Sequence, residues 1–183
     1  MERKTAADFD QELLILFDAY VHGDIDRRGF LERASRFAVG GVTAAMLLEA
    51  LNPKFAEAQL VPKDDARLVT EFVPYPSPQG YTSTRGYLVK PKAASGKLPG
   101  IVVVHENRGL NPHIEDVARR FALEGYVVFA PDALASLGGY PGDEDKARAL
   151  FQQLDQAKVR EDMLAAYAFL KARPECTGKV GVT

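Results

Sequence analysis

A short polar segment, His105-Glu106-Asn107-Arg108-Gly109, follows directly on a run of apolar, mostly β-branched residues. Such a change is typical of a buried strand that ends in a surface loop. A loop at the carboxyl end of a strand can direct a backbone N–H at the oxygen that becomes negative during acyl transfer. The segment is therefore the first candidate for a catalytic loop. The alternative is that Glu106 is a solvated carboxylate paired with Arg108.

The histidines do not suggest a second site. His105 has no nucleophile elbow or orienting acid beside it, which favours a hydrogen bond to the backbone over a role as catalytic base. His113 stands at an expected helix start near Glu115 and Asp116, where a capping or surface role is favoured, and His22 belongs to the amino-terminal segment. Their irregular spacing does not indicate zinc, and no phosphate-binding glycine motif is present. We therefore expect no metal and no cofactor.

Other candidate residues each allow a functional and a structural interpretation. Asp132 follows an expected strand and either contacts a ligand or caps the backbone of a turn, which is the commoner role. Cys176 lies in an expected helix-to-strand loop rather than on a strand-to-helix elbow, so packing as a small apolar group is favoured over nucleophilic attack. Gly138-Gly139-Tyr140 belongs to a glycine-rich stretch that either covers a site as a lid or only relaxes a turn.

The elements that must position these residues alternate between strands and helices from residue 68 onward. Polar and apolar residues alternate at residues 68–75 and 82–89, which predicts an antiparallel hairpin at a sheet edge, where the prolines are tolerated. The elements expected after the hairpin are buried strands at residues 100–104, 126–130 and 179–183, and helices at residues 111–123, 143–154 and 159–172. The fold class is therefore α/β, a sheet with parallel strands and flanking helices behind a helical leader.

Residues 1–58 have the order of a twin-arginine export signal. The arginine pair at residues 27–28 precedes an uncharged apolar stretch at residues 37–48, and Ala-Glu-Ala at residues 56–58 is a small-x-small cleavage pattern. A signal of this kind is an address read by a receptor, and it predicts a periplasmic protein. The apolar stretch is shorter than the roughly 20 residues of a stable transmembrane helix, so we expect no membrane span.

The alternative for this segment is a helical hairpin that the protein retains, with a cytoplasmic location. Apolar residues recur at helical spacing from Asp8 onward, Gly23 is a suitable stop, and a second amphipathic helix begins after Asp26. Under both alternatives, residues 1–58 stand outside the catalytic fold, which occupies residues 59–183 and begins with a polar connector.

Composition excludes several classes of function. The 183 residues, 46% of them hydrophobic, suffice for an ordinary domain with a core. The net charge of -2 and the pI near 6.0 arise from charges mixed along the chain, so there is no electrostatic footprint for nucleic acid or an anionic membrane. A single cysteine rules out an intrachain disulfide. A small neutral or anionic metabolite is the expected partner.

The sequence contains Val-Val-Val-His-Glu-Asn-Arg-Gly-Leu-Asn at residues 102–111 and Gly-Tyr-Val-Val-Phe-Ala-Pro-Asp at residues 125–132. With these motifs the chain resembles the dienelactone hydrolase family of α/β-hydrolases, from about residue 68 to residue 183. The resemblance implies a carboxylic ester or lactone hydrolase. It also implies that Glu106 sits beside the nucleophile and that the Asn107 backbone N–H helps to form the oxyanion hole.

In that family, the strand that resembles residues 179–183 leads into a Gly-x-Cys-x-Gly or Gly-x-Ser-x-Gly elbow with the nucleophile, followed by an Asp and a His. The resemblance assigns none of these roles to a residue of this sequence. We therefore expect an incomplete α/β-hydrolase-type sheet that is inactive alone. Two alternatives remain open, a non-enzymatic assembly module whose open sheet edge pairs with a complementary chain, and a relic reading frame.

Overall fold

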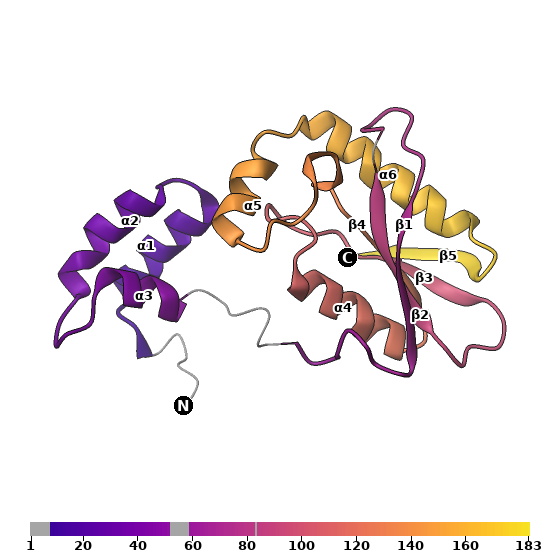
Figure 1. The fold of residues 1–183 in the computed structure, drawn as a ribbon, viewed down its shortest axis with the longest axis horizontal. Helices are drawn as coiled ribbons and strands as arrows, with labels where there is room; N and C mark the ends of the chain where they lie inside the picture. Colours follow the sequence, from indigo (N-terminus) through magenta and orange to yellow (C-terminus); the bar gives the residue numbers. More distant parts are fainter. Residues whose placement is uncertain (1–7, 52–58, 83) are drawn as a thin grey trace. The chain divides into compact units, whose positions relative to one another are not determined.

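The computed structural model of the protein describes residues 8–51, 59–82 and 84–183. The chain divides into two compact units. The amino-terminal unit is Met1–Lys54 and the sheet unit is Phe55–Thr183. Figure 1 shows helices in the first unit, and a sheet with helices in the second. The expected domain boundary after residue 58 and the Ala-Glu-Ala pattern both lie outside the described residues.

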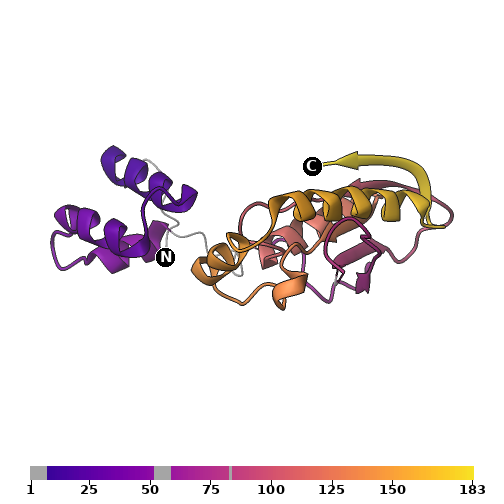
Figure 2. The ribbon, with the colours of Figure 1, turned by 90° about the horizontal axis from the view of Figure 1, so that it is seen from above.

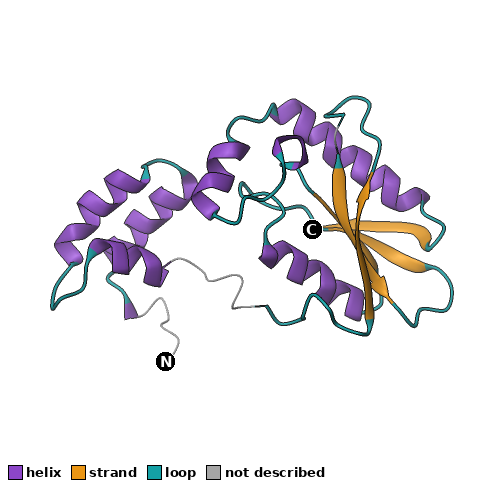
Figure 3. Ribbon diagram, viewed as in Figure 1, coloured by secondary structure: helices purple, strands orange, loops and turns teal. Residues whose placement is uncertain are grey.

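The described part of the amino-terminal unit is helical, as Figure 3 shows. Its elements are α1 (Gln11–His22), α2 (Arg27–Ala34), the short 3₁₀ helix η2 (Ser35–Phe37) and α3 (Ala44–Leu51). Asp10 and Asp26 accept backbone hydrogen bonds at the starts of α1 and α2, and Gly23 ends α1 in the left-handed conformation. The expected stop at Gly23 and the helix after Asp26 are therefore confirmed.

A hydrophobic core holds these helices together. Tyr20 of α1, Phe30 of α2 and Leu48 of α3 are almost completely buried in it. The uncharged stretch at residues 37–48 does not form one apolar helix, because Gly40 and Gly41 both have positive φ angles and turn the chain before α3. No helix among the described residues is both long and apolar enough to cross a membrane.

The described residues of the sheet unit form a five-stranded sheet in the order β1-β2-β4-β3-β5. The strands are β1 (Leu68–Pro74), β2 (Arg85–Pro91), β3 (Leu98–Val102), β4 (Val127–Pro131) and β5 (Cys176–Val182). β1 and β2 form the expected antiparallel hairpin, and β2 also pairs antiparallel with β4. β3 pairs parallel with both β4 and β5. Figure 2 shows β5 with the carboxyl end of the chain at its tip.

Helices cover both faces of this sheet, because side chains along a strand alternate between its faces. Val128 of β4 packs in the core cluster formed with α4 (Pro112–Leu123), whereas its neighbours Val127 and Phe129 pack in the cluster formed with α6 (Gln156–Ala172). The remaining elements after β4 are η3 (Ala135–Leu137) and α5 (Glu144–Phe151). The predicted α/β class is confirmed.

Some strand limits differ from those expected. β5 begins at Cys176, so this cysteine is the first residue of a strand and does not lie in the helix-to-strand loop predicted for it. Its thiol sulfur accepts a hydrogen bond from the Gly178 N–H at 3.4 Å, and its side chain is buried against α6. The expected packing of Cys176 as a small apolar group is confirmed.

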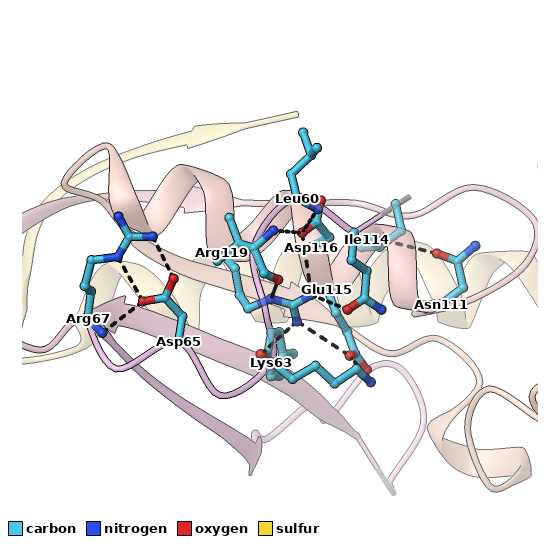
Figure 4. Close-up of polar contacts among 12 residues, drawn as sticks. Leu60, Lys63, Asp65, Arg67, Asn111, Ile114, Glu115, Asp116 and Arg119 are labelled. Carbon is cyan, nitrogen blue, oxygen red and sulfur yellow. Dashed lines mark hydrogen bonds and ion pairs between the residues drawn. The ribbon is translucent and has the colours of Figure 1, made fainter. Parts of the chain in front are cut away.

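The predicted polar connector at residues 59–65 is in part packed onto α4, as Figure 4 shows. The Asp116 carboxylate accepts hydrogen bonds from the backbone N–H groups of Leu60 and Val61 at 3.1 and 2.8 Å. The Arg119 side chain, which is 0% exposed, donates to the Val61 carbonyl and to the Tyr87 hydroxyl. These contacts incorporate the start of the sheet unit into its fold.

Candidate active site

The carboxyl ends of the parallel strands meet at one edge of the sheet, which is where open α/β sheets place their ligands. The Val103 N–H donates to the Phe129 carbonyl at 3.0 Å, and the Val104 N–H donates to the Thr183 carbonyl at 2.8 Å. These bonds bring the loop after β3, the turn after β4 and the end of β5 together. The polar segment that begins at His105 therefore starts at the centre of this edge.

His105 connects two of these segments by hydrogen bonds to the backbone, as expected from the sequence. Its Nε2 accepts from the Ala133 N–H at 3.1 Å, and its Nδ1 lies 2.7 Å from the Glu106 carbonyl oxygen. Since Nε2 accepts, the ring proton is on Nδ1 and donates to that oxygen. The side chain is 6% exposed, and burial lowers the pKa of His105. Because both nitrogens of this neutral imidazole form hydrogen bonds to the backbone, it is not available as a catalytic base.

Glu106 and Asn107 follow His105 in the loop, and Asn107 begins a turn that continues at Arg108. The Glu106 side chain is exposed and Asn107 is half-buried. The Asn107 backbone N–H donates to no acceptor within residues 8–51, 59–82 and 84–183. This N–H is therefore the candidate backbone donor of the loop.

The loop residues next to this turn are held by Glu144, the first residue of α5. Arg108 Nη1 and Asn111 Nδ2 donate to the two Glu144 carboxylate oxygens at 3.3 and 3.4 Å, and the Tyr140 hydroxyl donates to Oε1 at 2.8 Å. Burial, followed by the hydrogen bond to Glu144, raises the pKa of Tyr140. Arg108 pairs with Glu144, so the suggested pair with Glu106 is wrong. Within the described residues Arg108 Nη2 is buried without a partner.

Asp132 caps the turn after β4, which confirms the structural interpretation. Its Oδ1 accepts from the Leu134 N–H at 3.1 Å, and its Oδ2 accepts from Arg85 Nε at 3.2 Å. Burial raises the pKa of Asp132, although Arg85 opposes this effect. A Cβ atom at Gly139, where φ is +89°, would lie 2.2 Å from Arg85 Nη2. Glycine at position 139 therefore allows the glycine-rich loop to pack on this ion pair.

The remaining candidates lie elsewhere or have other partners. His113 is in the first turn of α4, where the Asn111 side chain caps the helix by accepting from the Ile114 N–H. A surface groove of about 750 Å³ lies between α6 and residues 76–79 and includes none of the residues from His105 to Asn111. No group of His, Cys, Asp and Glu in the described ranges can hold a metal ion. Glu144 could not be identified from the sequence, because its loop partners Arg108 and Asn111 lie 36 and 33 residues away in the chain.

Comparison with known proteins agrees with this geometry. The profile of the dienelactone hydrolase family matches residues 84–183, which include β2 to β5 and the whole loop after β3. The chain belongs to the dienelactone hydrolase family. A separate profile, described as YqhI-like, matches residues 1–39. The family resemblance expected from the two sequence motifs is therefore confirmed, and the amino-terminal unit has a match of its own.

Several relatives of the dienelactone hydrolase region are similar over different lengths. A protein of Escherichia coli K12 named hydrolase fragment YghX is 57% identical over 114 residues, which are 62% of this chain and 97% of that protein. A Synechocystis protein named carboxymethylenebutenolidase is 36% identical over 106 residues, 52% of this chain and 43% of the relative. One from Salmonella typhi is 50% identical over 80 residues, 44% of this chain and 29% of the relative. This chain thus spans less than half of each carboxymethylenebutenolidase.

Solved structures of the dienelactone hydrolase type have the same fold. A Klebsiella pneumoniae protein named dienelactone hydrolase has a TM-score of 0.52 and 28% identity, over 63% of this chain and 48% of that one. The dienelactone hydrolase-like promiscuous phosphotriesterase P91 from metagenomic libraries has a TM-score of 0.52 and 28% identity, over 64% and 48%. The sheet unit is therefore similar to about half of each of these structures.

Proposed function

We propose that residues 59–183 supply the oxyanion side of a carboxylic ester or lactone hydrolase of the dienelactone hydrolase type. The Asn107 N–H carries the proposal, because it is a backbone donor without an acceptor in the described chain, at the sheet edge where ligands bind. Membership of the family supports the reaction class. Residues 1–58 stand outside this catalytic fold.

The proposed reaction is acyl transfer through a covalent intermediate. A nucleophile attacks the carbonyl carbon of the ester or lactone, and the carbonyl oxygen takes the electron pair and becomes negative. The Asn107 N–H donates a hydrogen bond to this oxyanion, with Glu106 beside the nucleophile. The oxyanion then collapses and expels the alcohol oxygen, and water hydrolyses the acyl-enzyme. Residues 1–183 alone are inactive in this proposal, because it assigns the roles of nucleophile, acid and base to none of them.

The intact mass of the native product, isolated from its own host, tests this proposal first. A product heavier than the calculated 20.0 kDa that hydrolyses p-nitrophenyl esters supports it. Changing Glu106 to Gln in that product is expected to lower the hydrolysis rate, whereas Glu71→Gln, at an exposed position of β1, leaves it unchanged. Ester hydrolysis by the purified 183-residue chain, lost on Glu106→Gln, contradicts the proposed inactivity.

A second candidate is an assembly module that binds a separate chain along β5. In the described sheet β5 pairs with β3, and Val182 near its end is 61% exposed. An unpaired strand edge presents backbone N–H and C=O groups to an added strand. A native product of 20.0 kDa that copurifies with a partner, and whose partner protects the amides of β5 from hydrogen exchange, supports this alternative. A cooperatively unfolding monomer contradicts it.

For the amino-terminal unit, we propose that the helices remain on the protein. The support is the packed core, in which Tyr20, Phe30 and Leu48 bury their side chains against one another's helices. The same mass measurement tests this point. Loss of the mass of residues 1–58 establishes processing of the twin-arginine type and contradicts retention.

A further inference from the structure

The two ring nitrogens of His105 have different and fixed roles. The Ala133 N–H is a donor without any acceptor character, so Nε2, at 3.1 Å from that nitrogen, acts as the acceptor. The ring proton is then on Nδ1, which lies 2.7 Å from the Glu106 carbonyl oxygen. Both nitrogens thus connect the turn after β4 to the backbone of the catalytic loop.

The Glu106 carbonyl and the Asn107 N–H belong to the same peptide unit. The described chain contains no cis peptide bond, so this unit is planar and trans, and its C=O and N–H point in opposite directions. A hydrogen bond that fixes the carbonyl oxygen on the His105 side therefore fixes the N–H on the other side. The direction of the oxyanion donor is set by the bond to the imidazole.

We infer that His105 is a positioning residue that orients the Asn107 N–H toward the oxyanion of the substrate. The inference rests on the proposed function for the role of that N–H, whereas the geometry of the peptide unit is independent of it. His105 acts through the backbone and does not touch the reacting atoms.

The surroundings of His105 make it a rigid support. The ring is 6% exposed and stands edge-on to Phe151 of α5, with 6.0 Å between the ring centroids. Its acceptor bond is to Ala133, which is 3% exposed and directly follows the turn residue Asp132. The position of the loop is therefore fixed by the buried end of strand β4.

Two substitutions at His105 separate positioning from other effects. In His105→Gln the amide oxygen can accept from Ala133 and the amide nitrogen can donate to Glu106, so both bonds can be retained. In His105→Leu neither bond can form. Leu170→Val, in the buried core on α6, is the control for a general loss of stability.

The measurement is the residual dipolar coupling of the Asn107 N–H in the complete 183-residue chain, which reports the direction of that bond. We expect the wild-type coupling in His105→Gln and Leu170→Val, and a coupling averaged toward zero in His105→Leu. A wild-type coupling in a folded His105→Leu overturns the inference. So does loss of the coupling in the Leu170→Val control, which would show a merely structural effect.

If His105→Leu does not fold, a measurement on the wild-type protein tests the inference instead. Nitrogen-15 spectra of the imidazole are expected to show the neutral form with the proton on Nδ1, and the form with the proton on Nε2 overturns the inference. These outcomes are distinct from failure of the proposed function, because they need no catalysis. If the heavier native product is an esterase, His105→Leu is expected to lower kcat with little change in KM, up to the 100- to 1000-fold effect of a lost oxyanion donor.

Discussion

The Arg119 guanidinium donates through Nε to the Val61 carbonyl at 2.9 Å, from a side chain that is completely buried. Its other nitrogens lie 3.8 and 3.7 Å from the carboxylates of Glu115 and Asp116, one turn earlier in α4. Asp116 in turn holds the backbone of residues 60–61. A buried arginine thus attaches the first residues of the sheet unit to a helix that covers the sheet.

Replacing Arg119 by Ala is expected to destabilise the sheet unit by about 3 kcal/mol or more, because the change leaves the buried Asp116 carboxylate without its cationic partner. Arg120→Ala changes the same charge at the neighbouring, exposed position and is the matched control. The measurement is urea unfolding followed by circular dichroism. Equal midpoints for the two variants contradict the assigned role of Arg119.

Gly109 is expected to tolerate no side chain. Its φ angle is +71°, and an added Cβ would lie 2.5 Å from Leu134 Cδ1. Gly125→Ala is the control, since φ there is +93° but nothing lies within 4 Å of an added Cβ. We expect Gly125→Ala to cost about 1–2 kcal/mol from backbone strain alone and Gly109→Ala to cost more. Partial recovery of the unfolding midpoint in Gly109→Ala combined with Leu134→Ala would confirm the steric cause.

The stability of the sheet unit is expected to fall as pH decreases through the ordinary His pKa near 6.5. Burial lowers the pKa of His105, so below that pH the unfolded chain binds a proton that the folded chain does not. The contribution is complete above the unfolded pKa and is lost at up to about 1.4 kcal/mol per pH unit toward the folded value.

His105→Gln provides the control for this pH dependence, because it lacks the titrating ring. Asp132 and Glu106 lie near His105 and oppose the lowering of its pKa. Burial raises the pKa of Asp132, so the folded chain takes up a proton at that carboxyl more readily than the unfolded chain does. This uptake adds stability as the pH falls and opposes the effect of His105. The test is the difference in unfolding free energy between wild type and His105→Gln from pH 7.5 to 5.5. A difference that stays constant over that range is inconsistent with a buried neutral histidine.

Glu144→Gln is expected to loosen the loop after β3. An amide can accept from the Tyr140 hydroxyl, but it lacks the charge that pairs with Arg108, so we expect a loss of about 1–3 kcal/mol. Because the Glu144 carboxylate contributes to the raised pKa of Tyr140, the phenol is also expected to titrate at lower pH. Difference absorbance titration against Tyr140→Phe measures this. Glu124→Gln, at the exposed end of α4, is the control that leaves both quantities unchanged.

Local signals in the sequence predicted much of the fold. A helix is expected at residues 111–123, and the structure has Asn111 as the N-cap of α4, with Gly125 just beyond its end at a φ of +93°. Capping and left-handed turns depend on a few neighbouring residues, so they can be predicted from the local sequence. The β1–β2 hairpin is local in the same sense.

Contacts between residues that lie far apart in the chain were not predicted from the sequence. The backbone role of His105 was predicted, whereas its acceptor bond from Ala133 joins loops 28 residues apart. Arg119 was not predicted to be buried, because arginine is almost never fully buried unless it is paired, and Val61 and Tyr87, to which it donates, lie in other segments. Glu144 was missed for the same reason.

The reactivity of the Cys176 thiol reports on the opening of β5, the edge strand of the described sheet. Cys176 is the single cysteine of the sequence, it is 2% exposed, and it begins β5. A thiol must be reached by solvent before it reacts, so an alkylating reagent labels this chain only after β5 has separated from α6 or the unit has unfolded. The rate of alkylation thus measures the opening of that strand, and no introduced probe is needed for the measurement.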